Sequence, residues 1–148
     1  LGCASILTGG VAEVSGIASD FLGINARIKP DYRNTSLIAD LKTCMDARSD
    51  AFARSVVNYG YEVQAAYYVD VAAAIDGKQR DFYWVAVEKD APYAVAVYKA
   101  SADMLERGRQ AYRKAIELYK ECAALDLWPA YSQQVQELNL PKWALETT

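Results

Sequence analysis

The sequence contains no histidine among its 148 residues. This absence excludes Ser-His-Asp triads, histidine general acids and bases, and histidine metal ligands. Only three cysteines are present, Cys3, Cys44 and Cys122, and no Cys-x-x-Cys spacing occurs. An odd number of scattered cysteines indicates neither a zinc site nor a disulfide framework, so we expect a reducing, cytoplasmic compartment.

Long apolar runs and a strong positive charge are also missing. No run approaches the about 20 residues of a membrane-spanning helix, so we expect no membrane association. The net charge of −3 gives no positive field over the whole molecule that would by itself indicate nucleic acid. The opening LGCASILTGG has no basic segment typical of a signal peptide, and we expect a chain that begins partway through a larger protein.

The hydrophobic content of 53% is high enough for a globular core. The length suits one domain, so we expect a single domain over residues 1–148. Alternation and helical periodicity then predict the elements. We expect a three-stranded antiparallel meander at 11–18, 22–29 and 36–43, helices at 46–57 and 60–76, strands at 81–89 and 93–100, and a helix at 101–125. This order, βββααββα, predicts an α/β or α+β domain with one mixed, largely buried sheet.

The stretch IKPDYRNTSLIADLKT places charge inside an apolar run. Asp40 and Lys42 alternate with apolar neighbours on a predicted strand, so both side chains lie on one face. Antiparallel pairing brings Asp31 alongside them. Two carboxylates at this range repel each other unless a cation lies between them, and hard oxygen ligands suit Mg²⁺ or Mn²⁺. We therefore predict a metal site formed by Asp31, Asp40 and the backbone carbonyl of Leu41.

Lys42 beside such a site stays protonated and has no lone pair to accept a proton. We expect it to orient the attacking water and to stabilise charge on a phosphate. On the helix predicted at 60–76, Gln64 and Tyr68 are four residues apart and share a face. From spacing alone, a functional role and a packing role remain equally open for these two residues.

The Asp-x-Lys pattern is weak by itself, because Asp76-Gly77-Lys78 also matches it. That second copy falls at a predicted helix end and has no Pro-Asp pair upstream, so we interpret it as a turn. The copy at Asp40 lies on an apolar strand, and Pro30-Asp31 precedes it by nine residues.

The combination Pro30-Asp31, Asp40-x-Lys42-Thr43 and Gln64-x-x-x-Tyr68 resembles the PD-(D/E)xK nuclease superfamily. More closely, it resembles the RecE-like catalytic domain of exodeoxyribonuclease VIII from phage-type recombination. The similarity runs from about Glu13 to Trp143. It includes the segments EVSG and GYEVQAAYY, and the tail motifs Trp128-Pro129 and Leu140-Pro141-x-Trp143.

The resemblance implies a restriction-endonuclease-like core and a Mg²⁺-dependent exonuclease that digests one strand of double-stranded DNA from its 5′ end. It implies that Asp31, Asp40, Lys42, Gln64 and Tyr68 are catalytic. It also implies metal ligation by Asp31 and Asp40, with Glu13 as a further candidate ligand. Its implied partners are double-stranded DNA ends, a single-strand annealing protein and further copies of the chain in a ring-like homo-oligomer.

Two family features have no counterpart in this sequence: a helical segment ahead of the first strand and a histidine near the metal. We therefore expect a nuclease domain that is truncated at its N-terminus. Two alternatives stay open. One is a catalytically impaired nuclease-like domain that binds DNA or a partner, and the other is an endonuclease of the same superfamily. An endonuclease with an iron–sulfur cluster is disfavoured, because it needs four suitably placed cysteines.

Overall fold

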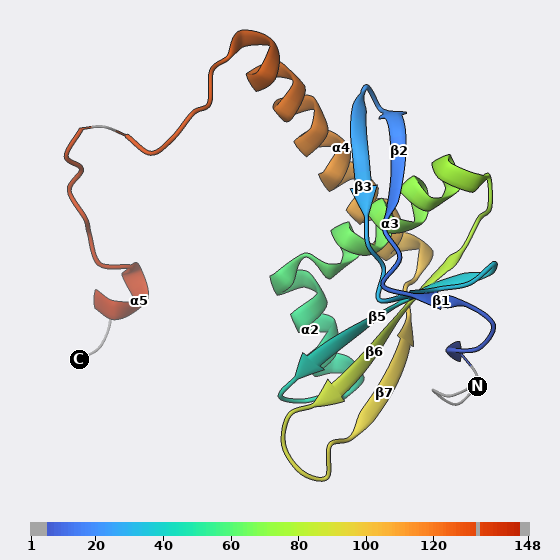
Figure 1. The fold of residues 1–148 in the computed structure, drawn as a ribbon. Helices are drawn as coiled ribbons and strands as arrows, with labels where there is room; N and C mark the ends of the chain where they lie inside the picture. The colour runs from blue at the N-terminus through green and yellow to red at the C-terminus, as the bar shows by residue number, and fades with distance from the viewer. Residues whose placement is uncertain (1–5, 133, 146–148) are drawn as a thin grey trace.

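The structure is a computed structural model that describes residues 6–132 and 134–145. Figure 1 shows its strands and helices along the chain. In order, they are β1 (Val11–Ala12), β2 (Gly16–Phe21), β3 (Ile24–Ile28), β4 (Tyr32–Arg33), β5 (Leu37–Cys44), α2 (Ser49–Tyr59), α3 (Tyr61–Asp76), β6 (Asp81–Glu88), β7 (Val95–Lys99), α4 (Ala102–Leu125) and α5 (Lys142–Leu145).

A mixed five-stranded sheet forms the centre of the molecule, with the strand order β1-β4-β5-β6-β7. Strands β5 and β6 run parallel, in a register that places Asp40 opposite Trp84. The other neighbouring pairs of this sheet are antiparallel. A parallel pair needs a long crossover connection, and α2 and α3 supply it between β5 and β6. The predicted mixed α+β fold is thereby confirmed.

The predicted three-stranded meander is wrong. Strand β3 pairs with β2 in a separate two-stranded hairpin that projects beside α3 and α4 (Figure 1), and β5 pairs with the two-residue strand β4 instead. The strand expected at 11–18 is also broken, because Glu13 turns the chain with a positive φ of 57°. Alternation along a strand indicates which face a side chain takes, but it does not identify the neighbouring strand.

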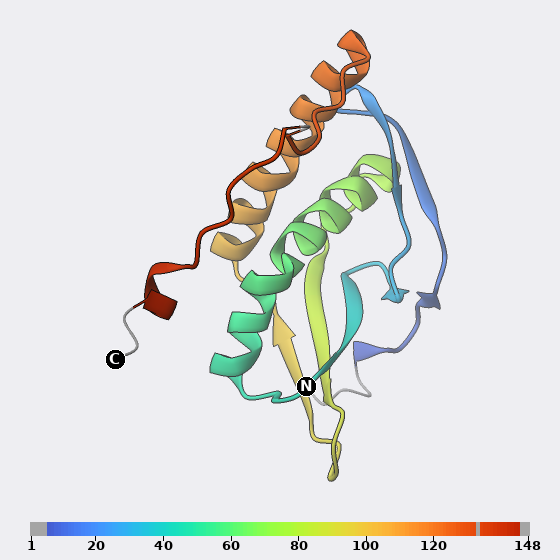
Figure 2. The same ribbon diagram turned by 90° about the vertical axis from the view of Figure 1, so that its left-hand side faces the viewer.

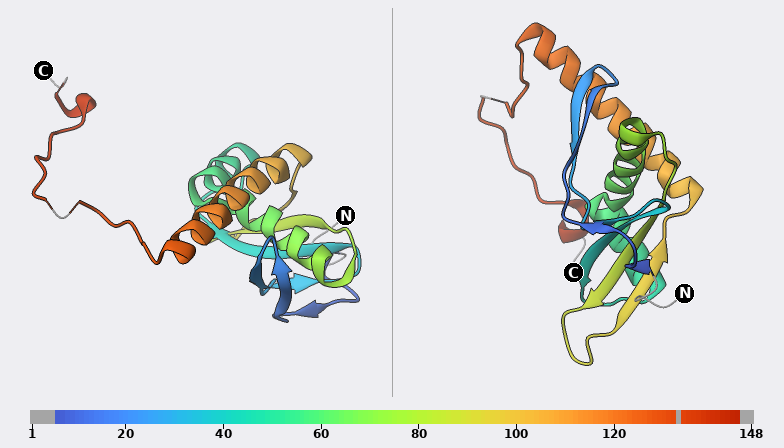
Figure 3. Two further views of the ribbon diagram at one scale, coloured as in Figure 1. Left: turned by 90° about the horizontal axis from the view of Figure 1, so that it is seen from above. Right: turned by 45° about the vertical axis from the view of Figure 1, so that its right-hand side comes forward.

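Helices α2 and α3 cover one face of the sheet, and α4 lies alongside α3 (Figures 2 and 3). On this face Phe52 of α2 stacks on Tyr98, with ring centroids 5.3 Å apart, and meets Trp84 edge-on at 6.3 Å. The largest fully buried side chains are Trp84, Phe82, Ile28, Ile38, Val56, Val71 and Pro30. The core thus lies between the sheet and the helix pair, on the same face of the sheet that carries Asp40.

Glycine sets both ends of α3. Gly60, at φ 65°, ends α2 and begins α3, and Gly77, at φ 72°, follows its last residue. This left-handed conformation is costly for residues that carry a Cβ. The predicted helix at 60–76 therefore agrees with α3 to within one residue. The tight turn at Gly60 fixes where the first turn of α3, with Gln64, lies relative to β5.

Helix α4 is tied to α3 by a close approach and by a partly buried carboxylate. At Gly108 an added Cβ would overlap the carbonyl oxygen of Glu62. Asp70 of α3 accepts hydrogen bonds from Arg109 Nε at 2.9 Å and from the Tyr112 hydroxyl at 2.6 Å. The burial of Tyr112 and its bond to Asp70 raise the pKa of its hydroxyl to about 12, so this group stays a hydrogen-bond donor.

Cys44 and Cys122 are buried and carry free thiols, whereas Cys3 lies outside the described residues. Trp128-Pro129 and Leu140-Pro141 lie in irregular chain that follows α4, and the side chain of Trp143 is likewise outside the described part. Within residues 6–132 and 134–145, no helix combines the length and the apolar character needed to cross a membrane.

Candidate active site

Asp40 and Lys42 lie on the helix-covered face of β5, as their spacing predicts. The carboxylate of Asp40 is 3% exposed, and its Oδ2 lies 2.6 Å from Lys42 Nζ. A carboxylate this deeply buried is costly unless charge and hydrogen bonds compensate it. Lys42 is therefore the first compensating group for Asp40.

Gln64 closes a triangle with these two residues. Its Nε2 donates to Asp40 Oδ1 at 2.9 Å, and its Oε1 accepts from Lys42 Nζ, also at 2.9 Å. One amide group therefore orients both the carboxylate and the ammonium. Spacing alone left the role of Gln64 open; the structure brings it into contact with both members of the Asp-x-Lys motif.

Asp31 lies in the connection between β3 and β4, and its side chain contacts the backbone of β5. Its Oδ2 accepts a hydrogen bond from the Leu41 backbone N–H at 2.7 Å. Strand β4 pairs with β5 only at Ile38 and Ala39, so the Asp31 carboxylate takes the place that the next residue of β4 would occupy. The N–H and C=O of one strand residue point to the same side. The Leu41 carbonyl therefore points to the edge where Asp31 lies.

The surroundings of Asp40 raise the pKa of its carboxyl group. Burial is the largest cause and raises the pKa of Asp40 above its usual value, and the negative charge of Asp31 adds to it. The hydrogen bond and positive charge of Lys42 and the hydrogen bond of Gln64 lower the pKa without reversing the shift. In addition, Asp40 Oδ2 has no hydrogen bond of good geometry, although Lys42 Nζ lies nearby. The site thus has spare acceptor capacity and an excess of negative charge.

These oxygens fit a hard divalent cation. The available donors are the carboxylates of Asp31 and Asp40 and the carbonyl of Leu41. No group of three or more histidine, cysteine, aspartate or glutamate side chains occurs within the described residues, so a cage made only of side chains is absent there. Mg²⁺ commonly binds through one or two carboxylates and completes its shell with water and substrate phosphate. The donor set therefore suits Mg²⁺ or Mn²⁺.

Glu13 and Tyr68 lie near the site but outside the triangle. The carboxylate of Glu13 pairs with Lys29 Nζ at 2.5 Å, and its backbone N–H donates to the Asp31 carbonyl at 3.1 Å. The hydroxyl of Tyr68 donates to the Lys29 carbonyl at 3.4 Å. Both residues thus contact the segment that carries Asp31, and the side chain of Glu13 is paired with a lysine.

Sequence reasoning missed Tyr61. Lys42 Nζ lies 4.5 Å from the centroid of its ring, which places the cation over the aromatic face. Tyr61 precedes Gln64 by three residues on α3, so helical spacing could have identified it as a neighbour of the site. The second Asp-x-Lys copy is a helix-end turn, as expected: Asp76 is the last residue of α3 and pairs with Arg80 at 2.5 Å.

Comparison with known proteins supports the fold. The crystal structure of a "Putative exonuclease" from Eubacterium rectale superposes with a TM-score of 0.71 at 16% sequence identity, over 96% of this chain and 59% of that one. The chain therefore spans about three fifths of the length of that protein. A crystal structure of SSO0001 aligns with a TM-score of only 0.41, at 16% identity, over 72% of this chain and 52% of that one.

No curated protein sequence matches the chain. The model of one family matches residues 3–141, and its description is a PDDEXK-like domain of unknown function (DUF3799). The match spans the sheet, helices α2, α3 and α4, and the Asp40–Lys42–Gln64 triangle. The resemblance to the PD-(D/E)xK superfamily and to its restriction-endonuclease-like fold is thereby confirmed, and it supports a function of the nuclease type. The chain belongs to this family of PDDEXK-like domains.

Proposed function

We propose that the chain is the catalytic part of a metal-dependent exonuclease that hydrolyses one strand of double-stranded DNA in the 5′ to 3′ direction. The observation that carries the proposal is the triangle of Asp40, Lys42 and Gln64 with Asp31 beside it. It combines a surplus of hard oxygen ligands with one fixed cation, which is the pairing that phosphodiester hydrolysis requires.

Asp31, Asp40 and the Leu41 carbonyl would hold Mg²⁺ or Mn²⁺, which when bound supplies a Lewis acid for the phosphate and lowers the pKa of water. Lys42 contributes its ammonium, which donates hydrogen bonds to the attacking water and to the phosphate oxygens. Gln64 holds Lys42 and Asp40 in position, so neither side chain has to reorganise when the substrate arrives. Tyr68 positions the strand from the same helix.

The resemblance to RecE-like enzymes extends the proposal to biology. We propose action on double-stranded DNA ends in phage-type recombination, together with a single-strand annealing protein and as a homo-oligomer. Strand polarity and assembly rest on that resemblance, while the residues at Asp40 support the chemistry. The cytoplasm is the compartment in which such an enzyme would act.

The deciding experiment compares end-labelled linear duplex with circular duplex, each in Mg²⁺ and in chelator. We expect linear duplex to lose nucleotides from its 5′ ends in Mg²⁺ only, while the circle stays intact. Cutting of the circle would replace the proposal with an endonuclease. Binding of linear duplex without any cutting would identify a catalytically impaired DNA-binding domain.

A further inference from the structure

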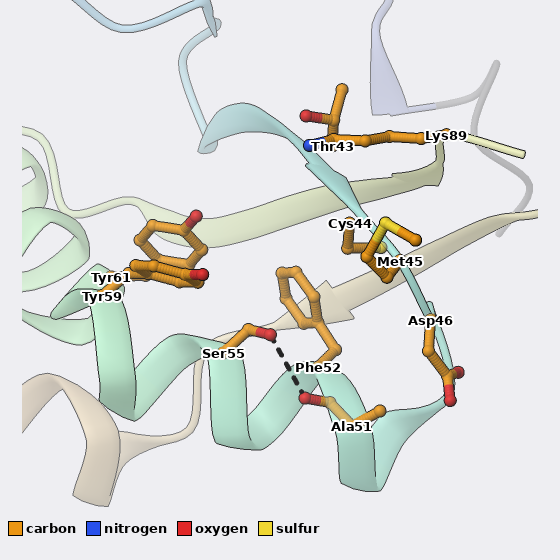
Figure 4. A pocket seen from close by; sticks show the side chains of 10 residues that line it. All are labelled: Thr43, Cys44, Met45, Asp46, Ala51, Phe52, Ser55, Tyr59, Tyr61 and Lys89. Atoms are coloured by element: carbon orange, nitrogen blue, oxygen red, sulfur yellow. Dashed lines mark hydrogen bonds between the residues drawn. The ribbon is translucent and has the colours of Figure 1, made fainter.

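A pocket of about 280 Å³ opens next to the candidate active site (Figure 4). This volume lies just below the range of small-molecule sites, about 300–1,000 Å³. The end of β5, helix α2 and the first residue of α3 line it. The lining includes Cys44, Met45, Phe52, Ser55, Tyr59 and Tyr61.

Tyr61 belongs to both the pocket and the active site. Its ring lies under Lys42 Nζ at 4.5 Å and also forms part of the pocket wall. Cys44, in the same wall, follows Lys42 by two residues on the same face of β5, a separation of about 7 Å along the strand. The pocket therefore adjoins the space around the Lys42 ammonium group.

A stacked aromatic pair forms one side of this pocket. The rings of Tyr59 and Tyr61 lie 5.5 Å apart with an interplanar angle of 26°. Tyr59 is 72% exposed, so much of its ring faces solvent. Single exposed apolar residues are common on protein surfaces. Here, however, the exposed ring extends a stack that leads into a pocket, which suits a flat aromatic ligand.

The charges around the pocket favour a ligand that carries phosphate. Asp46 is the acidic residue of the lining, and Arg48 neutralises it through an ion pair of 2.7 Å. Lys89 also lines the pocket and contributes an ammonium group. A nucleotide chain combines a flat base with a phosphate, and both features have a counterpart in this pocket.

We propose that this pocket binds an unpaired nucleobase of the DNA strand whose phosphate lies at Lys42, with the base stacked on the exposed ring of Tyr59 so that it extends the Tyr59–Tyr61 stack. The proposal rests on the proposed nuclease function, since it places the reacting phosphate at Lys42. Stacking tolerates any base, because each base presents a π face. The pocket would thus hold a strand end apart from its complement without reading its sequence.

The test measures binding of the full chain to two fluorescent oligonucleotides by anisotropy, in chelator so that no cleavage occurs. One is oligothymidylate, and the other is an abasic chain of equal length with the same phosphates. We expect the parent to prefer oligothymidylate and Tyr59→Ala to reduce this preference about 5- to 150-fold. Tyr59→Phe keeps the ring and should keep the preference. Tyr131→Ala removes a tyrosine that is 98% exposed outside the pocket, and serves as the matched control.

The proposal is overturned if the preference for oligothymidylate over the abasic chain is the same in Tyr59→Ala and in the parent. It is likewise overturned if the parent binds both chains equally or binds neither. Mg²⁺-dependent cleavage of linear duplex, measured on the same preparations, separates the two hypotheses. If cleavage is intact and Tyr59→Ala does not change the preference, the nuclease function is supported and the base-binding pocket is rejected. If the preference depends on Tyr59 but no cleavage occurs, the base-binding pocket is supported and the nuclease function is rejected.

Discussion

Gln64 donates a hydrogen bond of 2.9 Å to Asp40, a residue 24 positions away in the chain, and so connects the first half of α3 to the centre of the sheet. The same amide accepts from Lys42. Its two hydrogen bonds make Gln64 a positioning residue. The expected consequences of losing it differ from those of losing a surface glutamine.

Gln64→Ala should lower both stability and activity. It leaves an oxygen of the buried Asp40 without its donor, which costs about 1–3 kcal/mol in the free energy of unfolding. Loss of a partner that orients a metal ligand typically costs about 10- to 100-fold in activity. Urea unfolding and single-turnover cleavage measure the two effects. Gln110→Ala, at an exposed position of α4, is the matched control and should change neither.

Lys42→Ala should fold and bind Mg²⁺ but cleave about 10²- to 10³-fold more slowly, because one preorganised charge is lost from the transition state. Lys42→Arg should not restore the rate, since a planar guanidinium presents its donors in a different geometry. Lys78→Ala provides the control in the second Asp-x-Lys copy, where the recorded hydrogen bonds of Lys78 are made by its backbone. Equal losses at Lys42 and Lys78 would refute the assignment.

Asp40→Asn should abolish binding of Mg²⁺ or Mn²⁺ in calorimetry, because the substitution removes one of two carboxylates while it keeps the shape of the side chain. Asp50→Asn, on the surface of α2 beside Arg54, should bind metal as the parent does. Undiminished binding in Asp40→Asn would place the metal elsewhere.

Without metal, Asp40→Asn should increase the free energy of unfolding at neutral pH. The folded-state pKa of Asp40 is raised above 3.8, mainly by burial, so ionisation favours the unfolded chain. The contribution of Asp40 is thus most favourable below pH 3.8 and is lost as pH rises through the higher folded-state pKa. Urea unfolding in chelator should show the advantage of the variant at pH 7 shrinking toward pH 3.8. A constant difference across that range would contradict the raised pKa.

Asp76→Ala should destabilise the fold without affecting the site. Arg80 lowers the pKa of Asp76 from 3.8 to about 2, so this pair stabilises the protein above pH 3.8 and loses its effect as pH falls toward 2. The loss of a partner for the buried Arg80 should cost about 1–3 kcal/mol at neutral pH. Urea unfolding at several pH values measures this cost, while Mg²⁺ affinity should stay at the parental value.

Local sequence signals predicted the elements around the site well. Helical periodicity and Gly77 marked α3, and alternation placed Asp40 and Lys42 on one face, because both signals depend on residues close together in the chain. The meander was wrong because strand pairing depends on how distant elements pack. Tyr61 was missed although its spacing of three residues from Gln64 is a local signal. The two-residue strands β1 and β4 are too short to produce a periodic pattern at all.

The close approach at Gly108 links α4 to the candidate active site, although the helix lends no side chain to the triangle. The backbone of Glu62 that it touches lies two residues before Gln64, in the same turn of α3. A side chain at Gly108 would push that turn away and carry the Gln64 amide off Asp40 and Lys42. The packing of α3 against α4 therefore couples a substitution at Gly108 to the alignment of Asp40, Lys42 and Gln64.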